Sequence, residues 1–504
     1  MMESSILFLD NKAQDRFDLR GILDDLRLTA VIDGIVSIYE SEEIRRFFYL
    51  KAKDRGEALF RQDIYKDLME PKIKDIAERF LKRYKTHLIY FYNAKTVSQQ
   101  QSREKWHLDA AYLYCRAVSG LDDELNSAGY SSKGLGRLHK AVKAYRSTKE
   151  YALLEKDAFD CFALIASRRY QIDLDLSGYR IGIHKDTEST DFCSEIEKTF
   201  ARYNSPAFDF AITALPGIHM GDLELLILNA LIQDYPEVFT ELSEFAAAHP
   251  CFGSAMFDTL LPELQFYLSC MAYMKRLSDK GFPICFPEFS DVRGGAITGG
   301  YDLSAVNDAR PDDITENDFT QNPGESVFLI TGPNRSGKTT FARQLGQIAY
   351  FAALGLPVPC KTAKLLWFDG LFTHFAREEE LSNHLGRLKE ELVRLRSILD
   401  AMPDESLVIL NDIFSSTTAY DAYEIGKRVI EMLSERKCVC LFVTHMRELQ
   451  SIGRKPVLFV AGEAGPQRYT FRRGSGGTKN DYTEILAEYD LGYEAITMRL
   501  RRRF

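Results

Sequence analysis

Eight consecutive residues, 332 to 339 of 504, have the types and spacing that hold a nucleotide phosphate. Gly332, Gly337, Lys338 and Thr339 fit the pattern G-x-x-x-x-G-K-[ST]. Glycines let the backbone curl until successive N–H groups point inward at phosphate oxygens. The lysine brings a point charge to the β- and γ-phosphates, and the next hydroxyl ligates Mg²⁺. The sequence therefore predicts ATP and Mg²⁺ binding by Gly332, Pro333, Asn334, Arg335, Ser336, Gly337, Lys338, Thr339 and Thr340.

A second stretch, "ILNDIFSSTTAYD" (residues 409–421), bears on what happens to that ATP. A phosphate-loop hydrolase usually ends this strand in an Asp that holds the waters of Mg²⁺ and an acid that orients the attacking water. Here those places hold Asn411 and Asp412. An amide oxygen accepts a hydrogen bond from a metal-bound water but brings no charge, and Asp412 is one methylene shorter than Glu. We expect Asn411 to hold Mg²⁺ through water, and Asp412 to lie near the metal and act as a weak base.

Two alternatives remain open for this strand end. Shifting the register by one position would place Asp412 at the magnesium position and Ile413 at the base. The site would also suit a switch that holds ATP and seldom hydrolyses it, although we expect slow hydrolysis.

The elements that must position these residues differ between the two halves of the chain. Residues 1–295 are mostly helical in pattern, with apolar residues three and four apart in segments such as 73–93 and 223–248. Two alternating runs within Tyr170–Asp186, separated by Ser177-Gly178, predict a hairpin. From about residue 300, apolar runs alternate with helical patterns, which is typical of an α/β domain. The predicted strands are "SVFLI", "KLLWF", "SLVIL", "CVCLFV" and "PVLFV".

Composition limits the possible partners. The 64 basic and 73 acidic residues give a formal net charge of −9, so a nucleic-acid footprint must be a local patch. The nine cysteines are scattered and suit reduced thiols in a cytoplasmic protein. No stretch approaches the ~20 apolar residues of a membrane span, and the first residues do not form a secretory signal. We therefore expect a cytoplasmic protein with no membrane partner.

Several motifs together resemble the ATPase domain of the MutS family of DNA mismatch-repair proteins. They are "TGPN" followed by "GKT", "SLVILNDIFSSTTAYDA", "FVTHMREL", Asn317-Asp318 and "GSGGTKNDYTEILA", and they span about 310–490. The resemblance implies an ABC-like phosphate-loop ATPase. It also implies that Asn317 lies near the adenine, that His445 contacts the γ-phosphate region, and that Lys338, Asp412 and His445 are the catalytic residues.

The first half resembles the same family more loosely. "FRQDIYKDL" is similar to the start of its core helical domain, the hairpin to a clamp at the end of its lever helices, and "KRLSDKGFPICFPEF" to the return into the ATPase domain. The resemblance implies a multidomain protein with a mostly α N-terminal region, a small β insert and the α/β ATPase domain. The expected parts are a core and ascending lever (1–165), a clamp-like insert (166–215), returning helices (216–298), the ATPase domain (299–490) and a basic tail (491–504).

Repair-type members of the family carry about two further domains in front, the first with a Phe-x-Glu wedge for the mismatch. This sequence begins near the core domain, so we expect no mismatch-recognition domain in it. Phe286-Pro287-Glu288 spells the same pattern just before the ATPase half, and we interpret it as a packing turn.

Contacts with DNA and with a second subunit are predicted from charge and from the resemblance. Basic residues three and four apart on one helix side make a candidate patch that would bind DNA phosphates, or simply a solvated helix face. The DNA candidates are Arg137, Lys140, Lys143, and Arg180 and Lys185 of the hairpin. Asp421 is implied to contact a dimer partner. Ser382 would face the partner's ATP, or only cap the helix that carries Leu388, Leu392, Leu395 and Leu399.

These observations favour an ATP-dependent DNA-binding protein, a homodimeric clamp that acts in DNA repair or recombination and hydrolyses ATP slowly. In a bacterium it would be associated with the nucleoid. An alternative is a non-catalytic ATP-binding switch or scaffold that works through protein partners, which Asn411 supports. A phosphate-loop kinase is disfavoured by the Thr-His and "STTAYD" motifs. The DNA structure that is bound does not follow from the sequence.

Overall fold

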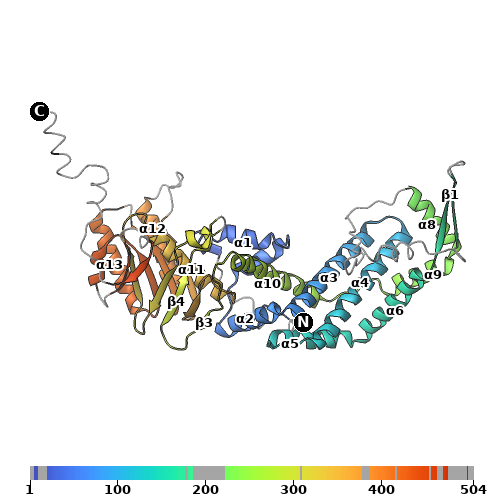
Figure 1. The fold of residues 1–504 in the computed structure, drawn as a ribbon, viewed down its shortest axis with the longest axis horizontal. Helices are drawn as coiled ribbons and strands as arrows, with labels where there is room; N and C mark the ends of the chain where they lie inside the picture. The colour runs from blue at the N-terminus through green and yellow to red at the C-terminus, as the bar shows by residue number, and fades with distance from the viewer. Residues whose placement is uncertain are drawn as a thin grey trace. The chain divides into compact units, whose positions relative to one another are not determined.

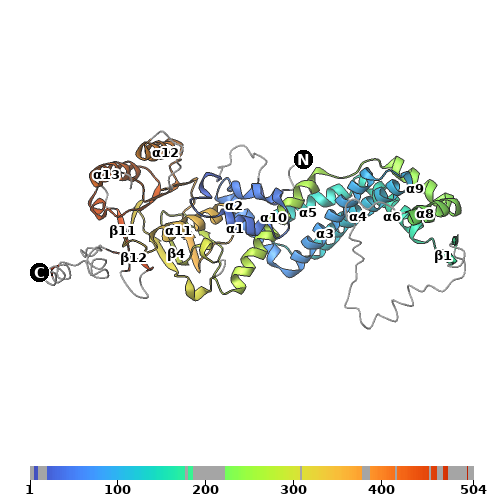
Figure 2. The ribbon, with the colours of Figure 1, turned by 90° about the horizontal axis from the view of Figure 1, so that it is seen from above.

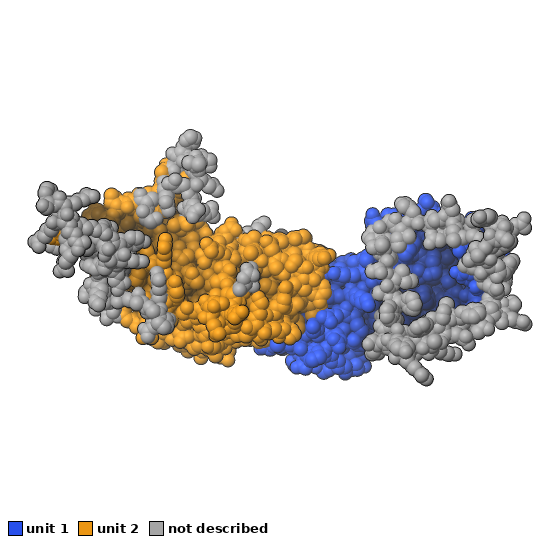
Figure 3. Space-filling model, turned by 45° about the horizontal axis from the view of Figure 1, so that its top comes forward, with its two compact units in different colours: residues 1–7, 66–265 blue, residues 8–65, 266–504 orange. Residues whose placement is uncertain are grey.

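The computed structural model describes residues 5–9, 20–175, 180–185, 222–306, 309–376, 386–414, 417–452, 456–462, 469–474 and 497. The chain forms two compact units: unit 1 comprises residues 1–7 and 66–265, and unit 2 comprises residues 8–65 and 266–504 (Figure 3). The boundaries fall inside helices α2 (Arg55–Met69) and α10 (Ala255–Asp279), so each helix contributes to both units. Among the described helices, none combines the length and the apolar character needed to cross a membrane.

Unit 1 is built on two long helices that pack side by side, α3 and α4, with α5, α6 and α9 against α4 (Figures 1 and 2). Pro71 opens α3 at a position where its missing N–H costs nothing, and residues three and four apart from Ile73 to Tyr84 bury one face. Ser132 and Thr148 cap α5 and α6. The helices of unit 1 are α3 (Pro71–Thr96), α4 (Gln100–Ser127), α5 (Lys133–Arg146), α6 (Lys149–Ala166), α8 (Asp222–Asp234) and α9 (Pro236–Ala248).

The predicted hairpin of unit 1 is confirmed as a pair of antiparallel strands. These are β1 (Tyr170–Asp175) and β2 (Arg180–Lys185), and Tyr170 pairs with Lys185. The predicted turn at Ser177-Gly178 lies outside the described residues. The apolar segment 223–248 is divided into α8 and α9, because Pro236 cannot continue the first helix and instead begins the second.

The described residues of unit 2 form two sheets. The larger has the strand order β12-β11-β6-β10-β9-β8 and is parallel except for β12, and the smaller has the order β3-β7-β4-β5. The strands are β3 (Glu288–Phe289), β4 (Gly295–Gly300), β5 (Asn317–Gln321), β6 (Val327–Thr331), β7 (Thr362–Leu365), β8 (Gly370–Phe375), β9 (Ser406–Asn411), β10 (Val439–Val443), β11 (Val457–Ala461) and β12 (Phe471–Arg473). The helices are α1 (Thr29–Val36), α11 (Lys338–Ala353), α12 (Arg387–Ala401) and α13 (Ala419–Glu435).

Helices cover both faces of the larger sheet. On one face, Leu329, Leu410 and Phe442 pack with α12 and α13 in one hydrophobic core. On the other face, α11 contacts β6, β8, β9 and β10 and also β4 of the smaller sheet (Figures 1 and 2). Burial on both faces explains why β6, β9 and β10 are continuous apolar runs. Because these three strands are parallel, their carboxyl ends lie at one edge of the sheet, beside the start of α11.

Buried polar contacts tie the first part of unit 2 to α11. Arg343 Nη1 lies 3.1 Å from Asp302 Oδ2. Gln347 Nε2 donates to Asp302 Oδ1 (2.7 Å) and to the carbonyl of Leu26 (2.9 Å). Residues 8–65 therefore belong with the sheets, although the sequence places them in a helical core. The expected division at 165, 215, 298 and 490 stays a prediction.

The prediction of a helical region followed by an α/β domain is confirmed, with differences in detail. Four of the five predicted strands match β6, β9, β10 and β11. The prediction of a strand over "KLLWF" is wrong after Leu365, because β7 ends there. The segment Phe286-Pro287-Glu288 lies in packed structure, because the Phe286 ring centroid is 5.4 Å from that of Tyr65 and Gln62 Nε2 donates to the Pro287 carbonyl.

Candidate nucleotide-binding site

The phosphate loop connects β6 to α11, as its sequence predicts. Gly332 and Gly337 have φ angles of 154° and 85°, a region that favours glycine. A Cβ atom on Gly332 would lie 2.6 Å from Ala461 Cβ, so this glycine is also needed for the close approach of β11. Arg335 has a φ of 60°. The loop therefore curls as a phosphate-binding loop must, and α11 starts at Lys338 with its N-terminus directed at the same place.

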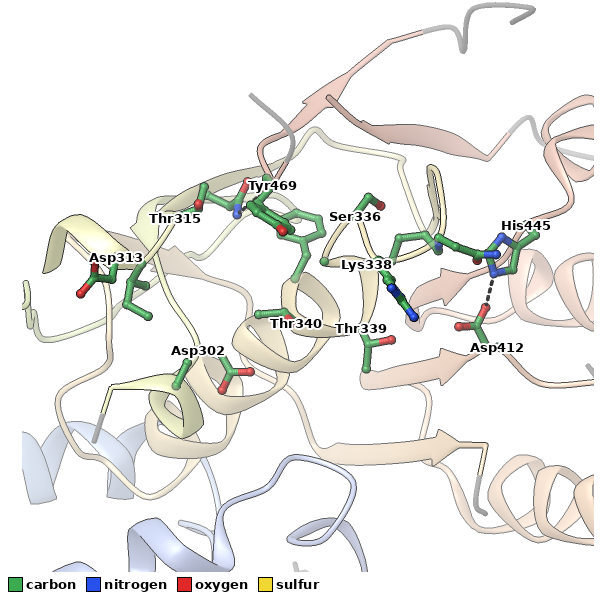
Figure 4. A pocket seen from close by; sticks show the side chains of 17 residues that line it. Asp302, Asp313, Thr315, Ser336, Lys338, Thr339, Thr340, Asp412, His445 and Tyr469 are labelled. Atoms are coloured by element: carbon green, nitrogen blue, oxygen red, sulfur yellow. Dashed lines mark hydrogen bonds and ion pairs between the residues drawn. The ribbon is translucent and has the colours of Figure 1, made fainter. Parts of the chain in front are cut away.

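A cavity of about 480 Å³ opens beside the loop (Figure 4). Asn334 to Thr340 line it, together with the sequence-predicted Asn317, Asp412 and His445. The lining residues that the sequence analysis missed are Asp302, Ala305, Asp313, Ile314, Thr315, Phe341 and Tyr469. The structure thus brings the predicted catalytic residues and most of the loop to one cavity.

Lys338 holds the loop closed on itself in this structure. Its Nζ atom donates to the carbonyls of Gly332 (3.0 Å) and Pro333 (2.8 Å), and the residue is only 5% exposed. The nearby Ser336 hydroxyl is buried and has no hydrogen-bond partner. A buried polar group without a partner is costly, so an anion accepted by the loop would satisfy groups that the protein leaves available.

The strand-end residues face the start of α11. Thr339 Oγ1 donates to Asn411 Oδ1 at 3.1 Å. Asp412 follows with a φ of 49°, and its N–H donates to the carbonyl of Val443 on β10. His445 Nε2 lies 3.5 Å from Asp412 Oδ1, and the His445 side chain is 51% exposed (Figure 4). A hydroxyl, an amide, a carboxylate and an imidazole from three elements therefore meet at one side of the cavity.

The donor set at this side fits Mg²⁺. Thr339, Asn411 and Asp412 offer oxygen atoms, which Mg²⁺ prefers, and Mg²⁺ usually keeps several waters beside one or two protein ligands. Within the described ranges, no three His, Cys, Asp or Glu side chains cluster around a possible metal position. These residues would accordingly hold Mg²⁺ together with water and phosphate oxygens.

Asn317 lines the cavity, but its amide is engaged with β12. Its Nδ2 donates to the carbonyl of Tyr469 (3.1 Å), and its Oδ1 accepts from the N–H of Phe471 (2.8 Å). A Cβ on Gly337 would meet the Tyr469 ring at 3.4 Å, so Asn317 holds an aromatic ring against the phosphate loop. Nothing in the sequence around Tyr469 marks it for this place, because its position depends on the pairing of β12 with β11.

A buried acid on α12 supports the turn that carries Asp412. Glu391 is 6% exposed, and its Oε2 accepts from the N–H of Phe414 at 2.9 Å. Phe414 has a φ of 67°, so the turn has two residues in the left-handed region. His374 Nε2 lies 3.1 Å from the Glu391 carbonyl, and burial, with the nearby Arg394, lowers the pKa of His374. Glu391 was not predicted, because in the sequence it is one of several acids on a charged helix.

We predict that Glu391 positions Asp412 for hydrolysis. Glu391→Ala leaves the buried Phe414 N–H unpaired, at a cost of roughly 1–3 kcal/mol, and loosens the turn. Single-turnover ATP hydrolysis should slow about tenfold or more, which corresponds to ~1.4 kcal/mol, with ATP affinity little changed. Glu391→Gln keeps an oxygen acceptor and should retain most of the rate. Equal rates for Glu391→Ala and the parent chain would show that the turn does not depend on this acid.

The candidate DNA residues differ in their surroundings. On α5, Lys133, Lys140 and Lys143 are exposed. Arg137 is partly buried and donates from Nη2 to the carbonyl of Ser5 at 2.9 Å, so it has a local structural role. Arg180 and Lys185 lie in β2, of which the structure describes the backbone only. Of the three candidates on α5, Lys140 and Lys143 are thus better placed than Arg137 to contact DNA.

Of the two residues predicted to face a dimer partner, the structure describes Asp421 but not Ser382. Asp421 is exposed at the start of α13, where its Oδ2 accepts from Thr418 Oγ1 (2.8 Å) and Thr418 in turn caps its N–H. Ser382 lies outside the described residues, and α12 begins at Arg387 with Gly386 in the N-cap position. Neither partner contact is tested by a single chain, so both stay predictions.

Comparison with known proteins places the site in a family. The sequence model of MutS domain V matches residues 328–459, from β6 to β11, and so includes the phosphate loop, Asn411, Asp412 and His445. Residues 328–459 are therefore similar to MutS domain V. The resemblance stated from the motifs is therefore confirmed for MutS domain V.

Curated relatives match part of the chain. The DNA mismatch repair protein MutS of Rickettsia bellii (strain OSU 85-389) is 34% identical over 167 residues, which are 32% of this chain and 19% of that protein. The DNA mismatch repair protein MutS of Petrotoga mobilis is 27% identical over 209 residues, which are 38% of this chain and 25% of that protein. The matches thus cover a quarter or less of the length of these relatives.

Proposed function

We propose that this chain is a MutS-type, ATP-dependent DNA-binding protein whose ABC-like phosphate-loop domain hydrolyses ATP slowly. The observation that carries the proposal is the cavity of MutS domain V. There Lys338, the Thr339–Asn411 contact, Asp412 and His445 converge on the space beside the phosphate loop. The names of the relatives add DNA mismatch repair as the setting in which such a domain acts. A cytoplasmic location follows as part of the same proposal.

In this proposal each residue has one task. The N–H groups of the loop and the Lys338 ammonium bind the phosphates, and Lys338 leaves its two carbonyl acceptors to do so. Thr339 and Asn411 hold Mg²⁺, which when bound offsets the charge of the phosphate oxygens. Asp412 orients the attacking water and accepts its proton, and His445, whose Nε2 lies 3.5 Å from Asp412 Oδ1, contacts the γ-phosphate region.

Slow hydrolysis follows from the two substituted positions. Asn411 supplies an oxygen without a negative charge, so it offsets less of the charge of Mg²⁺ than an aspartate would. The Asp412 side chain is one methylene shorter than that of a glutamate, and the Asp412 backbone adopts a left-handed conformation. Both differences reduce the stabilisation of the transition state for hydrolysis. ATP affinity is little affected, because the phosphate loop provides most of the binding.

A second candidate function is a switch or scaffold that binds ATP without hydrolysing it and acts through protein partners. The uncharged Asn411 beside Thr339 favours it. Single-turnover hydrolysis with excess protein separates the two: a rate that Asp412→Ala abolishes supports the slow ATPase, whereas no hydrolysis above background supports the switch.

DNA binding should be driven by backbone charge on α5. We expect affinity for all duplexes to fall steeply with salt, and Lys140→Glu with Lys143→Glu to weaken matched and mismatched duplexes alike. The salt slope should become shallower by about two, one for each lost phosphate contact. The control is Arg428→Glu with Lys437→Glu, two exposed residues at α13 with the same change in net charge. A strong preference for a mismatched duplex would contradict binding through charge alone.

Nucleotide should promote pairing of two chains through their ATPase domains. Asp421, exposed at the start of α13, is the residue that we expect to meet the partner. Light scattering at micromolar protein should show a larger mass with a non-hydrolysable ATP analogue than without it. Asp421→Asn keeps an oxygen acceptor for Thr418 and should weaken the pairing. A strict monomer with and without the analogue would exclude this mode of assembly.

A further inference from the structure

Two thiols of unit 2 lie in contact outside the nucleotide cavity. Cys285 Sγ and Cys360 Sγ are 3.4 Å apart, within hydrogen-bond distance for sulfur. The backbone holds the two segments together, because Cys285 donates to the carbonyl of Val358 (3.2 Å) and accepts from its N–H (2.8 Å). Cys360 follows two residues later and donates its own N–H to the same carbonyl (2.9 Å). Only a small movement is needed to reach the ~2.05 Å of a disulfide bond.

The two thiols have different surroundings. Cys285 is partly exposed, whereas Cys360 is buried. The hydrogen bond from Cys360 lowers the pKa of Cys285, helped by the N–H of Ala363 and opposed by burial. The same hydrogen bond and burial raise the pKa of Cys360. Cys285 is therefore the thiol of the pair that ionises more readily and that an oxidant reaches, and Cys360 is the thiol beside it that can complete the reaction.

The remaining described cysteines lack this arrangement. Cys115, Cys161, Cys270, Cys438 and Cys440 are buried, and Cys251 is exposed. Among the cysteines that the structure describes, no other two sulfur atoms lie within hydrogen-bond distance of each other. Among the described cysteines, the contact between two thiols is thus specific to Cys285 and Cys360.

We propose that Cys285 and Cys360 form an oxidisable dithiol, a modification site whose co-reactant is a small hydroperoxide such as hydrogen peroxide. The Cys285 thiolate attacks one peroxide oxygen, the O–O bond breaks, and hydroxide leaves and takes up a proton to form water. Cys285 is then a sulfenic acid. The Cys360 sulfur attacks the Cys285 sulfur, the S–O bond breaks, and hydroxide leaves as water with the Cys360 proton. The two sulfurs lose two electrons, and one peroxide becomes two waters.

The disulfide would close a ring that contains the phosphate loop and all of α11, since these lie between residues 285 and 360. Such a cross-link restricts the unfolded chain, and a long ring restricts it more. The oxidised chain should consequently unfold at a higher temperature than the reduced chain, and a thiol reductant should remove the difference. This inference does not depend on the proposed function, because it concerns thiols outside the cavity.

The test maps the thiols of the full chain after peroxide treatment. The chain is then unfolded in denaturant so that buried thiols are also accessible, unreacted thiols are blocked with N-ethylmaleimide, the chain is digested without reductant, and the peptides are identified by mass spectrometry. The result expected is a cross-linked peptide pair joining Cys285 to Cys360, short of two hydrogens and restored by dithiothreitol. Full blocking of both thiols, at peroxide concentrations that oxidise the exposed Cys251, would overturn the proposal.

Two variants separate the roles of the thiols. Cys360→Ser should leave Cys285 as a sulfenic acid that reacts with dimedone, and Cys285→Ser should leave Cys360 open to blocking after peroxide. If Cys360 is oxidised equally in the parent chain and in Cys285→Ser, the assigned order of attack is wrong. Cys251→Ser is the matched control and should form the Cys285–Cys360 bond as the parent chain does.

Discussion

Lys338→Ala should strongly weaken the binding of ATP and Mg²⁺ while the chain stays folded. Lys338 is the only described lysine among the residues that line the cavity, and its ammonium already lies against the loop that receives the phosphates. Hydrogen bonds to charged groups contribute about 1.5–3 kcal/mol each, so losing this one should weaken ATP binding by roughly 10- to 100-fold. Calorimetry with a non-hydrolysable analogue measures the affinity.

The control for this variant is Lys361→Ala. Lys361 is an exposed lysine of the same unit, paired with Glu316, and it does not line the cavity. Its replacement should leave ATP affinity unchanged. Thermal unfolding without nucleotide checks that Lys338→Ala is folded. Equal ATP affinity for Lys338→Ala and the parent chain would mean that the loop is not the nucleotide site.

Replacing Asn411 and Asp412 with the usual pair of acids, Asn411→Asp with Asp412→Glu, should speed hydrolysis with little change in ATP affinity. The Asp beside Thr339 restores a charge opposite Mg²⁺, and the Glu extends the base by one methylene. Losing a well-placed catalytic group commonly costs a factor of about 10² or more, so the gain should be at least about tenfold. Part of this gain in rate should be lost, because Asp adopts the left-handed backbone conformation of position 412 more readily than Glu does.

Asp412→Ala is the complementary variant. It removes the carboxylate that lies 3.5 Å from His445 and should abolish the hydrolysis that remains, with ATP still bound. Single-turnover rates with excess protein measure both effects. Hydrolysis by Asp412→Ala at the parent rate would mean that Asp412 is not the base. The Thr339–Asn411 hydrogen bond supports the register in which Asn411, and not Asp412, stands at the metal.

The parts of the fold and site that the sequence predicted are those with a local signal. The glycines and lysine of the phosphate loop have fixed spacing, and β6, β9 and β10 are apolar because both their faces are covered. The smaller sheet lacked such a signal: β3 has two residues, β4 reads "GAITGG" and β5 reads "NDFTQ". Glycine-rich and polar strands of this length cannot be told from loops by periodicity.

Residues whose role depends on distant packing were missed for the same reason. Glu391 acts on a turn 23 residues further along the chain, and Tyr469 is held beside Gly337 by Asn317, 152 residues away. Cys285 and Cys360 meet across 75 residues. Arg137 seemed available on a basic helix, yet it donates to the carbonyl of Ser5, 132 residues earlier in the chain. Only the tertiary structure brings such pairs together.

ATP bound in the cavity beside the phosphate loop should control DNA binding. Fluorescence anisotropy tests it with matched, mismatched, branched and single-stranded DNA at one salt concentration, with and without a non-hydrolysable ATP analogue. The account predicts that the analogue changes the DNA affinity of the parent chain and leaves that of Lys338→Ala unchanged. If the parent chain binds the analogue but shows the same affinity for every DNA with and without it, ATP does not control DNA binding and the account is wrong.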